Sequence, residues 1–339
     1  MMKDVYILGV ETSCDETSLS IVKNGTEEIV TITLSQMDTH ANFGGVVPEI
    51  ASRMHSENIT LILEELFNKT NLTMIDINAV AVTYAPGLLG SLLVGLEFAK
   101  TLSLVYQIPL IKVNHLIGHI YANAINGKMH YPLLALIVSG GHTELILMEK
   151  DYDFKVLGAT LDDAIGEVYD KVAKVLNLPY PGGPNIENYA KNGKVTYELP
   201  VTMKNNDLNF SYSGLKSAVI NLIHNEKQRG NEINISNMAC SFQVAAVDQL
   251  IRKTNSAINQ YKIPNLILAG GVSANEYLRE KMAELANECK VELLIPSMKY
   301  CTDNATMIAA AAYPLYLKEE FADFTLNAKS TVNIATISD

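Results

Sequence analysis

The segment Asp4-Val5-Tyr6-Ile7-Leu8-Gly9-Val10-Glu11-Thr12-Ser13-Cys14-Asp15-Glu16 decides the fold class of this chain. An apolar run at residues 4–10 leads into the polar stretch 11–16, and a second apolar run covers residues 17–23. Apolar runs of this length bounded by polar residues predict two β-strands joined by a polar turn. The chain therefore begins with a hairpin whose turn is acidic.

A second hairpin is expected at residues 133–138 and 143–148, around the turn Ser139-Gly140-Gly141-His142. Elsewhere the pattern alternates helices and strands, as in the helix that opens at Pro48 and the strand at residues 265–269. Such alternation is typical of an α/β protein. The two hairpins begin two successive α/β halves, which indicates a duplication of plan without residue identity.

Composition limits the possible function classes. The 339 residues, 48% hydrophobic, suit two packed domains. The net charge of −11 argues against broad nucleic-acid binding by the chain alone. No apolar run looks long enough to span a bilayer, and acidic residues come too early for a secretion signal. The four cysteines form no Cys-x-x-Cys pair, so we expect a reducing cytoplasm.

Two histidines, His115 and His119, lie four residues apart in an expected helix. This spacing puts both imidazoles on one helix face, where they can chelate one first-row metal ion. The alternative is a pair of structural histidines. Zinc peptidases with this spacing carry Glu directly after the first histidine, whereas this chain has Leu116.

Asp303 precedes an alanine-rich helix, where it can serve as the helix N-cap or as a third, oxygen ligand for the same ion. Two histidines and one carboxylate leave coordination positions open for substrate or water. In the first turn, Glu11, Asp15 and Glu16 suit a base, a metal–water contact or a hydrogen-bond clamp; the alternative is an exposed acidic turn.

Two glycine turns follow apolar strands. Gly270-Gly271 precedes a helix, an arrangement that lets the backbone approach a phosphate, and the N–H groups of Ser139-Gly140-Gly141 can form an anion-binding nest. Neither matches the phosphate loop or the dinucleotide fingerprint, so both can also be plain turns.

Taken together, the motifs resemble those of the bacterial tRNA N6-adenosine threonylcarbamoyltransferases, the TsaD family, once labelled glycoproteases. They occur in family order over essentially the whole chain. The matching segments are Gly9-Val10-Glu11-Thr12-Ser13-Cys14-Asp15-Glu16-Thr17, Gly44-Gly45-Val46-Val47-Pro48-Glu49, Pro86-Gly87-Leu88-Leu89-Gly90, His115-Leu116-Ile117-Gly118-His119, Val138-Ser139-Gly140-Gly141-His142-Thr143, Gly166-Glu167-Val168-Tyr169-Asp170-Lys171, Pro181-Gly182-Gly183-Pro184, Ser213-Gly214-Leu215-Lys216, Gly270-Gly271-Val272-Ser273-Ala274-Asn275 and Thr302-Asp303-Asn304.

The resemblance implies an actin/Hsp70/sugar-kinase fold, with two ribonuclease-H-like domains around a nucleotide-binding cleft. We expect a first domain at residues 1–112 plus about 302–330, and a second at 113–301 that carries the metal helix and a polar insertion. The resemblance implies one divalent metal per subunit, iron(II) or alternatively zinc(II), on His115, His119 and Asp303, with Asp15 and Glu16 as catalytic residues. It assigns substrate and nucleotide binding to Ile137, Val138, Ser139, Gly140, Gly141, Asp170, Gly183, Glu187 and Asn275, with Glu187 replacing the Asp of many members.

The implied activity is transfer of a threonylcarbamoyl group from threonylcarbamoyl-AMP to N6 of adenosine 37 in tRNAs that read codons starting with A. The implied partners are tRNA, a smaller paralogue (TsaB-like) and a P-loop ATPase (TsaE-like), in the cytoplasm and without a membrane. The alternatives are a small-molecule kinase of the same fold, a metallopeptidase and a non-enzymatic nucleotide-dependent scaffold. Bound metal distinguishes the transferase from the kinase.

Overall fold

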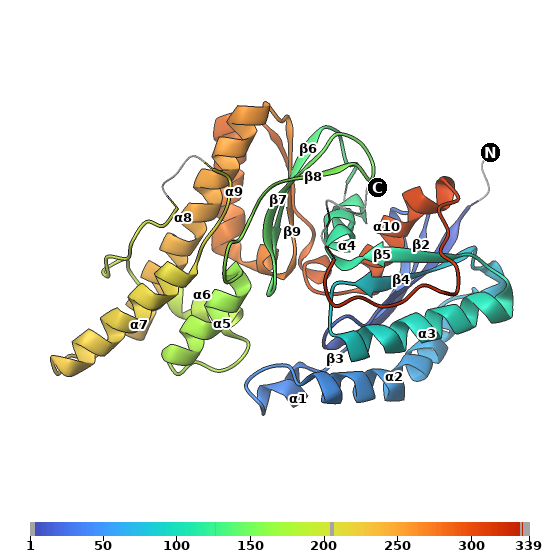
Figure 1. The fold of residues 1–339 in the computed structure, drawn as a ribbon, viewed down its shortest axis with the longest axis horizontal. Helices are drawn as coiled ribbons and strands as arrows, with labels where there is room; N and C mark the ends of the chain where they lie inside the picture. Colours follow the sequence, from blue (N-terminus) through green and yellow to red (C-terminus); the bar gives the residue numbers. More distant parts are fainter. Residues whose placement is uncertain (1–3, 126, 204–206, 333, 335–339) are drawn as a thin grey trace. The chain divides into compact units, whose positions relative to one another are not determined.

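The computed structural model describes residues 4–125, 127–203, 207–332 and 334, and it divides into two compact units (Figure 1). Unit 1 comprises Met1–Met129 and Pro296–Asp339, and unit 2 comprises His130–Ile295. These boundaries differ from the expected ones, because residues 113–129 and 296–301 belong to unit 1. Residues 1–3 of the expected first domain lie outside the described part of the chain.

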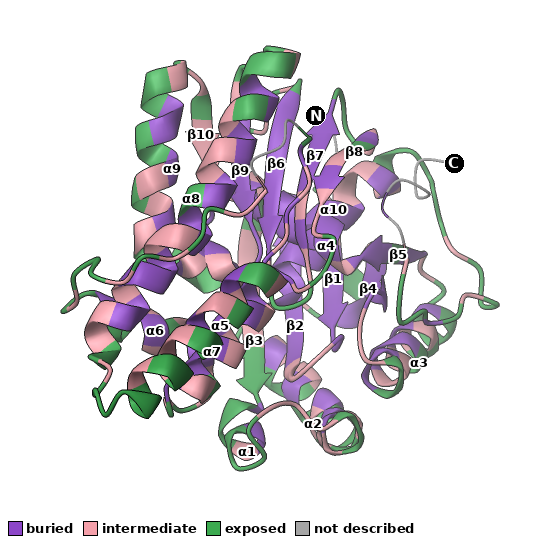
Figure 2. Cartoon of the chain, turned by 60° about the vertical axis from the view of Figure 1, so that its left-hand side comes forward, coloured by how far each residue is buried: buried purple, intermediate pink, exposed green. Residues whose placement is uncertain are grey.

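Unit 1 is built on a five-stranded mixed sheet in the order β3-β2-β1-β4-β5. The central strand β1 pairs antiparallel with β2 and parallel with β4, while β3 forms one edge and is the most exposed strand of the sheet (Figure 2). The strands are β1 Tyr6–Glu11, β2 Glu16–Lys23, β3 Glu27–Ser35, β4 Ala79–Ala85 and β5 Leu110–Asn114.

Unit 2 repeats this plan. Its sheet has the order β10-β9-β6-β7-β8, and the central strand β6 again has one antiparallel and one parallel neighbour. The expected duplication is therefore confirmed at the level of topology. The strands are β6 Leu133–Val138, β7 Thr143–Met148, β8 Phe154–Ala159, β9 Asn265–Ala269 and β10 Glu292–Leu294.

Helices cover both faces of the unit 1 sheet. Two long helices pack on one face through aliphatic residues such as Ile59 and Leu92, and the alanine-rich helix packs on the other with the short histidine helix (Figure 1). Alanines let that helix approach the strands closely. The unit 1 helices are α1 Met37–Ala41, α2 Pro48–Asn68, α3 Leu89–Tyr106, α4 His115–Tyr121 and α10 Ala305–Leu317, with 3-10 turns η1 Met74–Asp76, η2 Ala122–Ile125 and η4 Met298–Tyr300.

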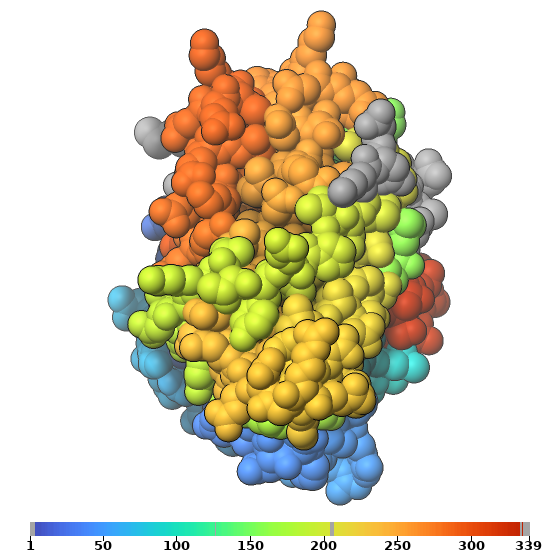
Figure 3. All heavy atoms as spheres, turned by 90° about the vertical axis from the view of Figure 1, so that its left-hand side faces the viewer, coloured from blue at the N-terminus to red at the C-terminus, as the bar shows by residue number. Residues whose placement is uncertain are grey.

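The core of unit 2 lies between its sheet and a group of helices, and it includes Leu136, Val168 and Phe242. Figure 3 shows one face of this unit, where α7 (gold) and α9 (orange) reach the surface. The helices are α5 Ile165–Val175, α6 Gly182–Ala190, α7 Ser213–Gln228, α8 Ile235–Tyr261 and α9 Glu276–Cys289, with the 3-10 turn η3 Gly271–Ala274.

Helix α3 contradicts the expectation that the chain has no apolar segment long enough to span a bilayer. By length and composition alone α3 meets that criterion. In the structure it packs against β4 and α2, and Leu92, Leu96 and Ala99 lie in the unit 1 core. A core helix of a soluble protein passes the same test, so α3 is weak evidence for a membrane span.

Glu144 on β7 provides a test of the packing in unit 2. Burial raises the pKa of this carboxyl to about 6, from an ordinary 4.5. The folded state therefore binds the proton more tightly than the unfolded state, and the stabilisation present below about pH 4.5 is lost as the pH rises through 6. Glu144→Gln is expected to raise the unfolding free energy near neutral pH by about 1–2 kcal/mol.

The measurement is thermal unfolding of the wild type and the variant between about pH 4 and pH 8. The gain in stability of Glu144→Gln over the wild type should disappear at the acidic end of this pH range, where the wild-type Glu144 carboxyl is protonated. Glu149→Gln, at an exposed position beyond the end of the same strand, serves as the control. An equal gain at both ends of the pH range would contradict the burial argument.

Candidate metal centre

The two histidines lie at the beginning of α4, directly after β5. Asn114 caps this helix, because its Oδ1 accepts hydrogen bonds from Leu116 N at 2.9 Å and Ile117 N at 3.4 Å. His115 is therefore the first helical residue, and His119 follows one turn later. Their ring centroids lie 4.7 Å apart, which confirms that both imidazoles share one side of the helix.

Asp303 meets both rings. Its Oδ1 lies 3.3 Å from Nε2 of His115 and 3.1 Å from Nε2 of His119. The candidate ligand atoms of the three residues all lie within 4.8 Å of one another. Asn304, not Asp303, is the N-cap of α10, because its side chain accepts from Met307 N. The alternative interpretation of Asp303 as a helix cap is therefore excluded.

Two close backbone approaches bring these segments together. A Cβ at Gly118 on α4 would lie 2.7 Å from Cδ1 of Ile308 on α10, and a Cβ at Gly9 on β1 would lie 2.3 Å from the carbonyl oxygen of Ala305. Either contact is too short for a real Cβ. Glycine at both positions lets α10 pack tightly against β1 and α4, and this packing sets Asp303 beside the histidines.

Glu11, one of the acidic residues considered in the first turn, contacts His115, a contact that the sequence did not predict. Its Oε2 lies 3.1 Å from Nδ1 of His115 and accepts a hydrogen bond from Thr83 Oγ1 at 2.6 Å, while Oε1 accepts from Ser13 N at 2.5 Å. The parallel strands β1, β4 and β5 end at one edge of the sheet. This shared edge could have indicated the contact from the sequence, because Glu11 is the last residue of β1 and His115 directly follows β5.

The two carboxylates beside the histidines favour the binding of a positive charge in the cluster. Burial alone would lower the pKa of His115, but the carboxylates of Asp303 and Glu11 raise it well above its ordinary value. Burial opposes ionisation of Asp303, yet the charge of His115 holds the pKa of Asp303 far below its usual range. Two carboxylates, two neutral imidazoles and one divalent cation would sum to zero charge.

The donor set also fits a metal ion. Nε2 of His119 is buried and faces Asp303, and neither ring nitrogen of this side chain forms a hydrogen bond of good geometry within the described residues. A buried nitrogen in this situation is expected where a ligand completes its bonding. Imidazole and carboxylate together suit iron(II) or zinc(II), and Glu11 supplies the carboxylate that commonly orients a metal-bound histidine.

Other residues of the acid turn, defined here as residues 11–16, lie near enough to Asp303 for its charge to affect their ionisation. Burial and then the charges of Asp303 and Asp15 raise the pKa of Glu16 well above its ordinary value. Burial and the carboxylate of Asp15 also raise the pKa of Cys14. A thiol with a raised pKa stays protonated near neutral pH, which argues against Cys14 as a nucleophile.

The glycine turns of unit 2 occupy the equivalent edge of the second sheet. Ile137 and Val138 are fully buried in β6, and Ile137 is paired with β7 on one side and β9 on the other, so neither residue is exposed to a ligand. Ser139 N–H already donates to His142 O at 2.9 Å, whereas Gly140 and Gly141 N–H have no hydrogen-bond acceptor among the described residues. Of the three residues expected to form the anion-binding nest, Gly140 and Gly141 therefore keep N–H groups that can donate to an anion.

The polar residues predicted to bind the nucleotide act as helix caps in the structure. Asp170 Oδ1 accepts from Gly182 N at 2.7 Å, at the beginning of α6. Glu187 Oε1 accepts from Glu276 N at 2.7 Å, at the beginning of α9. Asn275 caps the same helix through Leu278 N at 2.8 Å. The structure therefore shows a structural role that the sequence reasoning missed.

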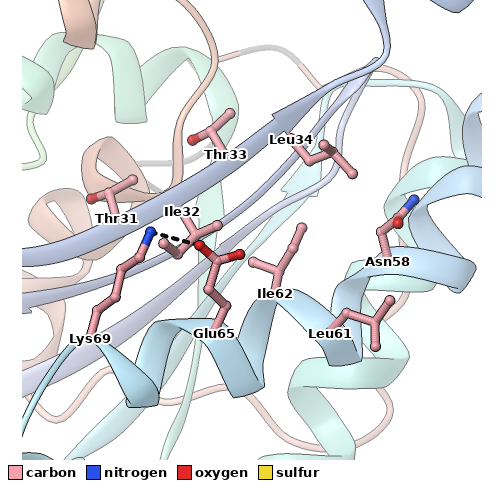
Figure 4. A pocket seen from close by; sticks show the side chains of 9 residues that line it. All are labelled: Thr31, Ile32, Thr33, Leu34, Asn58, Leu61, Ile62, Glu65 and Lys69. Atoms are coloured by element: carbon pink, nitrogen blue, oxygen red, sulfur yellow. Dashed lines mark ion pairs between the residues drawn. The ribbon is translucent and has the colours of Figure 1, made fainter.

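Two pockets lie away from the metal cluster. In unit 1, a cavity of about 410 Å³ between β3 and α2 contains the Glu65–Lys69 ion pair and apolar side chains, but none of the predicted site residues (Figure 4). In unit 2, a cavity of about 190 Å³ is lined by Glu187, Gln243 and Tyr277 among others. Asn275 lies beside it, because its amide donates to Gln243 Oε1 at 3.0 Å.

Comparison with known proteins identifies the family. A family model described as tRNA N6-adenosine threonylcarbamoyltransferase, TsaD, matches residues 28–310. The chain belongs to the TsaD family. It is 53% identical over 330 residues to the enzyme of that name from Geobacillus thermodenitrificans, covering 97% of this chain and 96% of the relative. The Geobacillus kaustophilus enzyme is 51% identical, with 98% of each chain covered.

Solved structures confirm the fold class expected of a TsaD family member. The activator of 2-hydroxyisocaproyl-CoA dehydratase from Clostridium difficile superposes with a TM-score of 0.53 at 16% identity, over 94% of this chain and 99% of that one. HypF from T. kodakarensis gives a TM-score of 0.60 at 13% identity, over 95% of this chain and 49% of that one. At these identities the likeness concerns the actin/Hsp70/sugar-kinase fold alone.

The metal centre is testable by metal content. His119→Ala and Asp303→Asn each remove one of three ligand groups, and each is expected to lower bound iron or zinc at least tenfold after dialysis. Elemental analysis by mass spectrometry measures the ratio of metal to protein. His224→Ala, an exposed histidine of α7 bonded to Gln228, is the matched control and should retain the metal. Full metal content in Asp303→Asn would contradict the assignment.

Glu11→Gln tests the support behind His115. The amide keeps the shape but loses the charge that holds the Nδ1 proton, so metal affinity should fall about 10–100-fold. Competition with a chelator of known affinity measures this change. Unchanged affinity would mean that Glu11 does not orient the ligand.

Proposed function

We infer that this protein transfers a threonylcarbamoyl group from threonylcarbamoyl-AMP to N6 of adenosine 37 in tRNAs that read codons starting with A. Membership of the TsaD family supports the reaction. The observation that carries the chemistry is the convergence of His115, His119 and Asp303 from two distant segments of unit 1. A sugar or acid kinase of the same fold has no use for such a cluster.

We propose that these three residues hold iron(II), with zinc(II) as the alternative. Two histidines and one carboxylate with open positions are typical of iron(II) sites, and the same ligands also bind zinc. When bound, the ion supplies a Lewis acid for a phosphoryl or carbonyl oxygen. Glu11 keeps the proton of His115 on Nδ1, so that Nε2 remains available as a ligand.

The acid turn provides the proton acceptor in this proposal. An aromatic amine is a weak nucleophile, so its proton must leave as the new carbon–nitrogen bond forms and AMP departs. Asp15 takes this proton or orients the amine, and Glu16 is the alternative. The cluster and the turn belong to the same unit, so packing within unit 1 sets their spacing.

Unit 2 binds the adenylate in this proposal. The N–H groups of Gly140 and Gly141 are the donors for a phosphate or an oxyanion. Gly270 adopts φ +90°, and a Cβ at this position would lie 2.5 Å from Val138 O, so the turn requires glycine. Asp170, Gly183, Glu187 and Asn275 shape the adjoining helix ends, and the carboxylate oxygens that do not cap a helix remain for the substrate.

Partner proteins share the recognition of tRNA. The net charge of −11 gives this chain little electrostatic attraction for a polyanion. We propose that a TsaB-like paralogue and a TsaE-like P-loop ATPase complete the tRNA-binding surface, in the cytoplasm. A metallopeptidase is the weaker candidate, because Leu116 occupies the position of the peptidase base.

Reconstituted transfer tests the function directly. The purified protein is supplied with tRNA, threonine, bicarbonate, ATP, an adenylate-forming enzyme and the two partners, and tRNA nucleosides are analysed by mass. Modified adenosine 37 is expected from the wild type and from His224→Ala. Asp303→Asn should lose at least about 100-fold of the rate, the scale of a lost Lewis-acid contact. Unmodified tRNA with the wild type would refute the function.

A further inference from the structure

Three successive carbonyl groups of the acid turn are held by donors from outside it. Each donor belongs to a different element of unit 1: the beginning of α3, the middle of α2 and the residue before α1. The pairs are Ser13 O with Leu88 N–H at 2.8 Å, Cys14 O with His55 Nε2 at 3.0 Å, and Asp15 O with Gln36 N–H at 2.9 Å.

Behind the Cys14 contact, hydrogen bonds run on through three buried side chains, each no more than 1% exposed. They connect the main chain before α2 with the acid turn. In order, Val47 N–H meets His40 Nδ1 (3.3 Å), His40 Nε2 meets Gln36 Oε1 (3.1 Å), Gln36 Nε2 meets His55 Nδ1 (3.3 Å), and His55 Nε2 meets Cys14 O (3.0 Å).

The two ends of this series of hydrogen bonds determine the direction in which every bond is donated. Val47 N–H can only donate, and Cys14 O can only accept. His40 must therefore accept at Nδ1 and donate from Nε2, and His55 must do the same. The amide of Gln36 fits in between, and its nitrogen also reaches Ala51 O at 3.3 Å. Every link agrees with one polarity and with two neutral imidazoles.

Two further observations favour this arrangement. Thr17 Oγ1 lies 2.7 Å from Nδ1 of His55 and can donate to the same lone pair. Burial also lowers the pKa of His55, which favours the neutral ring. A buried polar network that is satisfied at every link keeps one geometry, because any alternative leaves a buried donor or acceptor unpaired.

We propose that His40, Gln36 and His55 are positioning residues, which form a one-way hydrogen-bond chain that sets the acid turn in its reactive geometry. This inference rests on the proposed function, because it assigns Asp15 to the transfer step. The His55 side chain holds the peptide group between Cys14 and Asp15, whereas Gln36 holds Asp15 O through its main-chain N–H. A break in the hydrogen-bond chain therefore loosens the peptide group directly before Asp15. The metal ligands stay in place.

Two substitutions of one residue separate positioning from general stability. In His55→Gln, the amide nitrogen takes the place of Nε2 and can still donate to Cys14 O. In His55→Asn, the amide oxygen takes the place of Nδ1, so the bond to Cys14 O is lost while that to Thr17 can remain. Ile59→Val, one turn further along α2 in the unit 1 core, is the control for lost packing.

We expect kcat for threonylcarbamoyl transfer to fall at least tenfold in His55→Asn, with KM for tRNA changed less than twofold. His55→Gln should stay within threefold of the wild type, and bound metal should be unchanged in both. A merely structural role would make activity follow the unfolding temperature in all three variants, including Ile59→Val. Equal losses in His55→Asn and His55→Gln would overturn the proposal.

An NMR measurement that does not depend on catalysis tests the hydrogen-bond chain independently of the proposed function. The full-length protein is labelled with nitrogen-15 at histidine, and the protonated nitrogen of each ring is assigned by NMR near neutral pH. We expect His40 and His55 to be neutral and protonated at Nε2. A proton on Nδ1 of either ring would reverse a link and overturn the proposal, even if the wild type transfers the group. An inactive wild type with the expected protonation would refute only the function.

Discussion

The contact of Asp303 with two imidazoles is the constraint on which the rest of unit 1 depends. The cluster places two carboxylates, Asp303 and the fully buried Glu11, beside two largely buried histidines. Like charges in a partly dehydrated site repel each other unless a cation or a proton compensates. A divalent ion on two neutral imidazoles meets this requirement, whereas protonation of His115 alone leaves one negative charge.

The sheet topology explains why these side chains meet. Parallel strands bring their carboxyl ends to one edge, and the chain places Glu11, Thr83 and His115 at that edge from three separate segments. Unit 2 has the same strand order, and its corresponding hairpin turn carries glycines where unit 1 carries acids. One architecture thus supports a candidate cation site in one unit and a candidate anion site in the other.

Much of the framework could be predicted from the sequence, because its strands are strongly apolar and glycine or acidic residues mark their ends. The expected strands at residues 133–138 and 143–148 match β6 and β7 at every residue. The edge strand β8 was not predicted, because four of its six residues are partly or fully exposed and it lacks a continuous apolar run. Helix α1 was not predicted either, since five residues carry too little periodicity.

The three residues of the candidate metal centre were predictable from helical spacing and a familiar motif, but their surroundings were not. The expected domain boundary would have separated Asp303 from the histidines, whereas the packing of α4 on α10 keeps all three in unit 1. The contact of Glu11 with His115 was missed because it spans 104 positions. The capping roles of Asp170 and Glu187 depend on helix ends that approach in space, which spacing along the chain does not show.

Anomalous X-ray diffraction from crystals grown with iron(II) or zinc(II) tests the central claim most directly. The account requires a single strong peak at about 2.0–2.2 Å from Nε2 of His115, Nε2 of His119 and a carboxylate oxygen of Asp303. A peak bound elsewhere would contradict it. A crystal grown with saturating metal in which Asp303 still contacts both histidines directly, with no metal between them, would also contradict it.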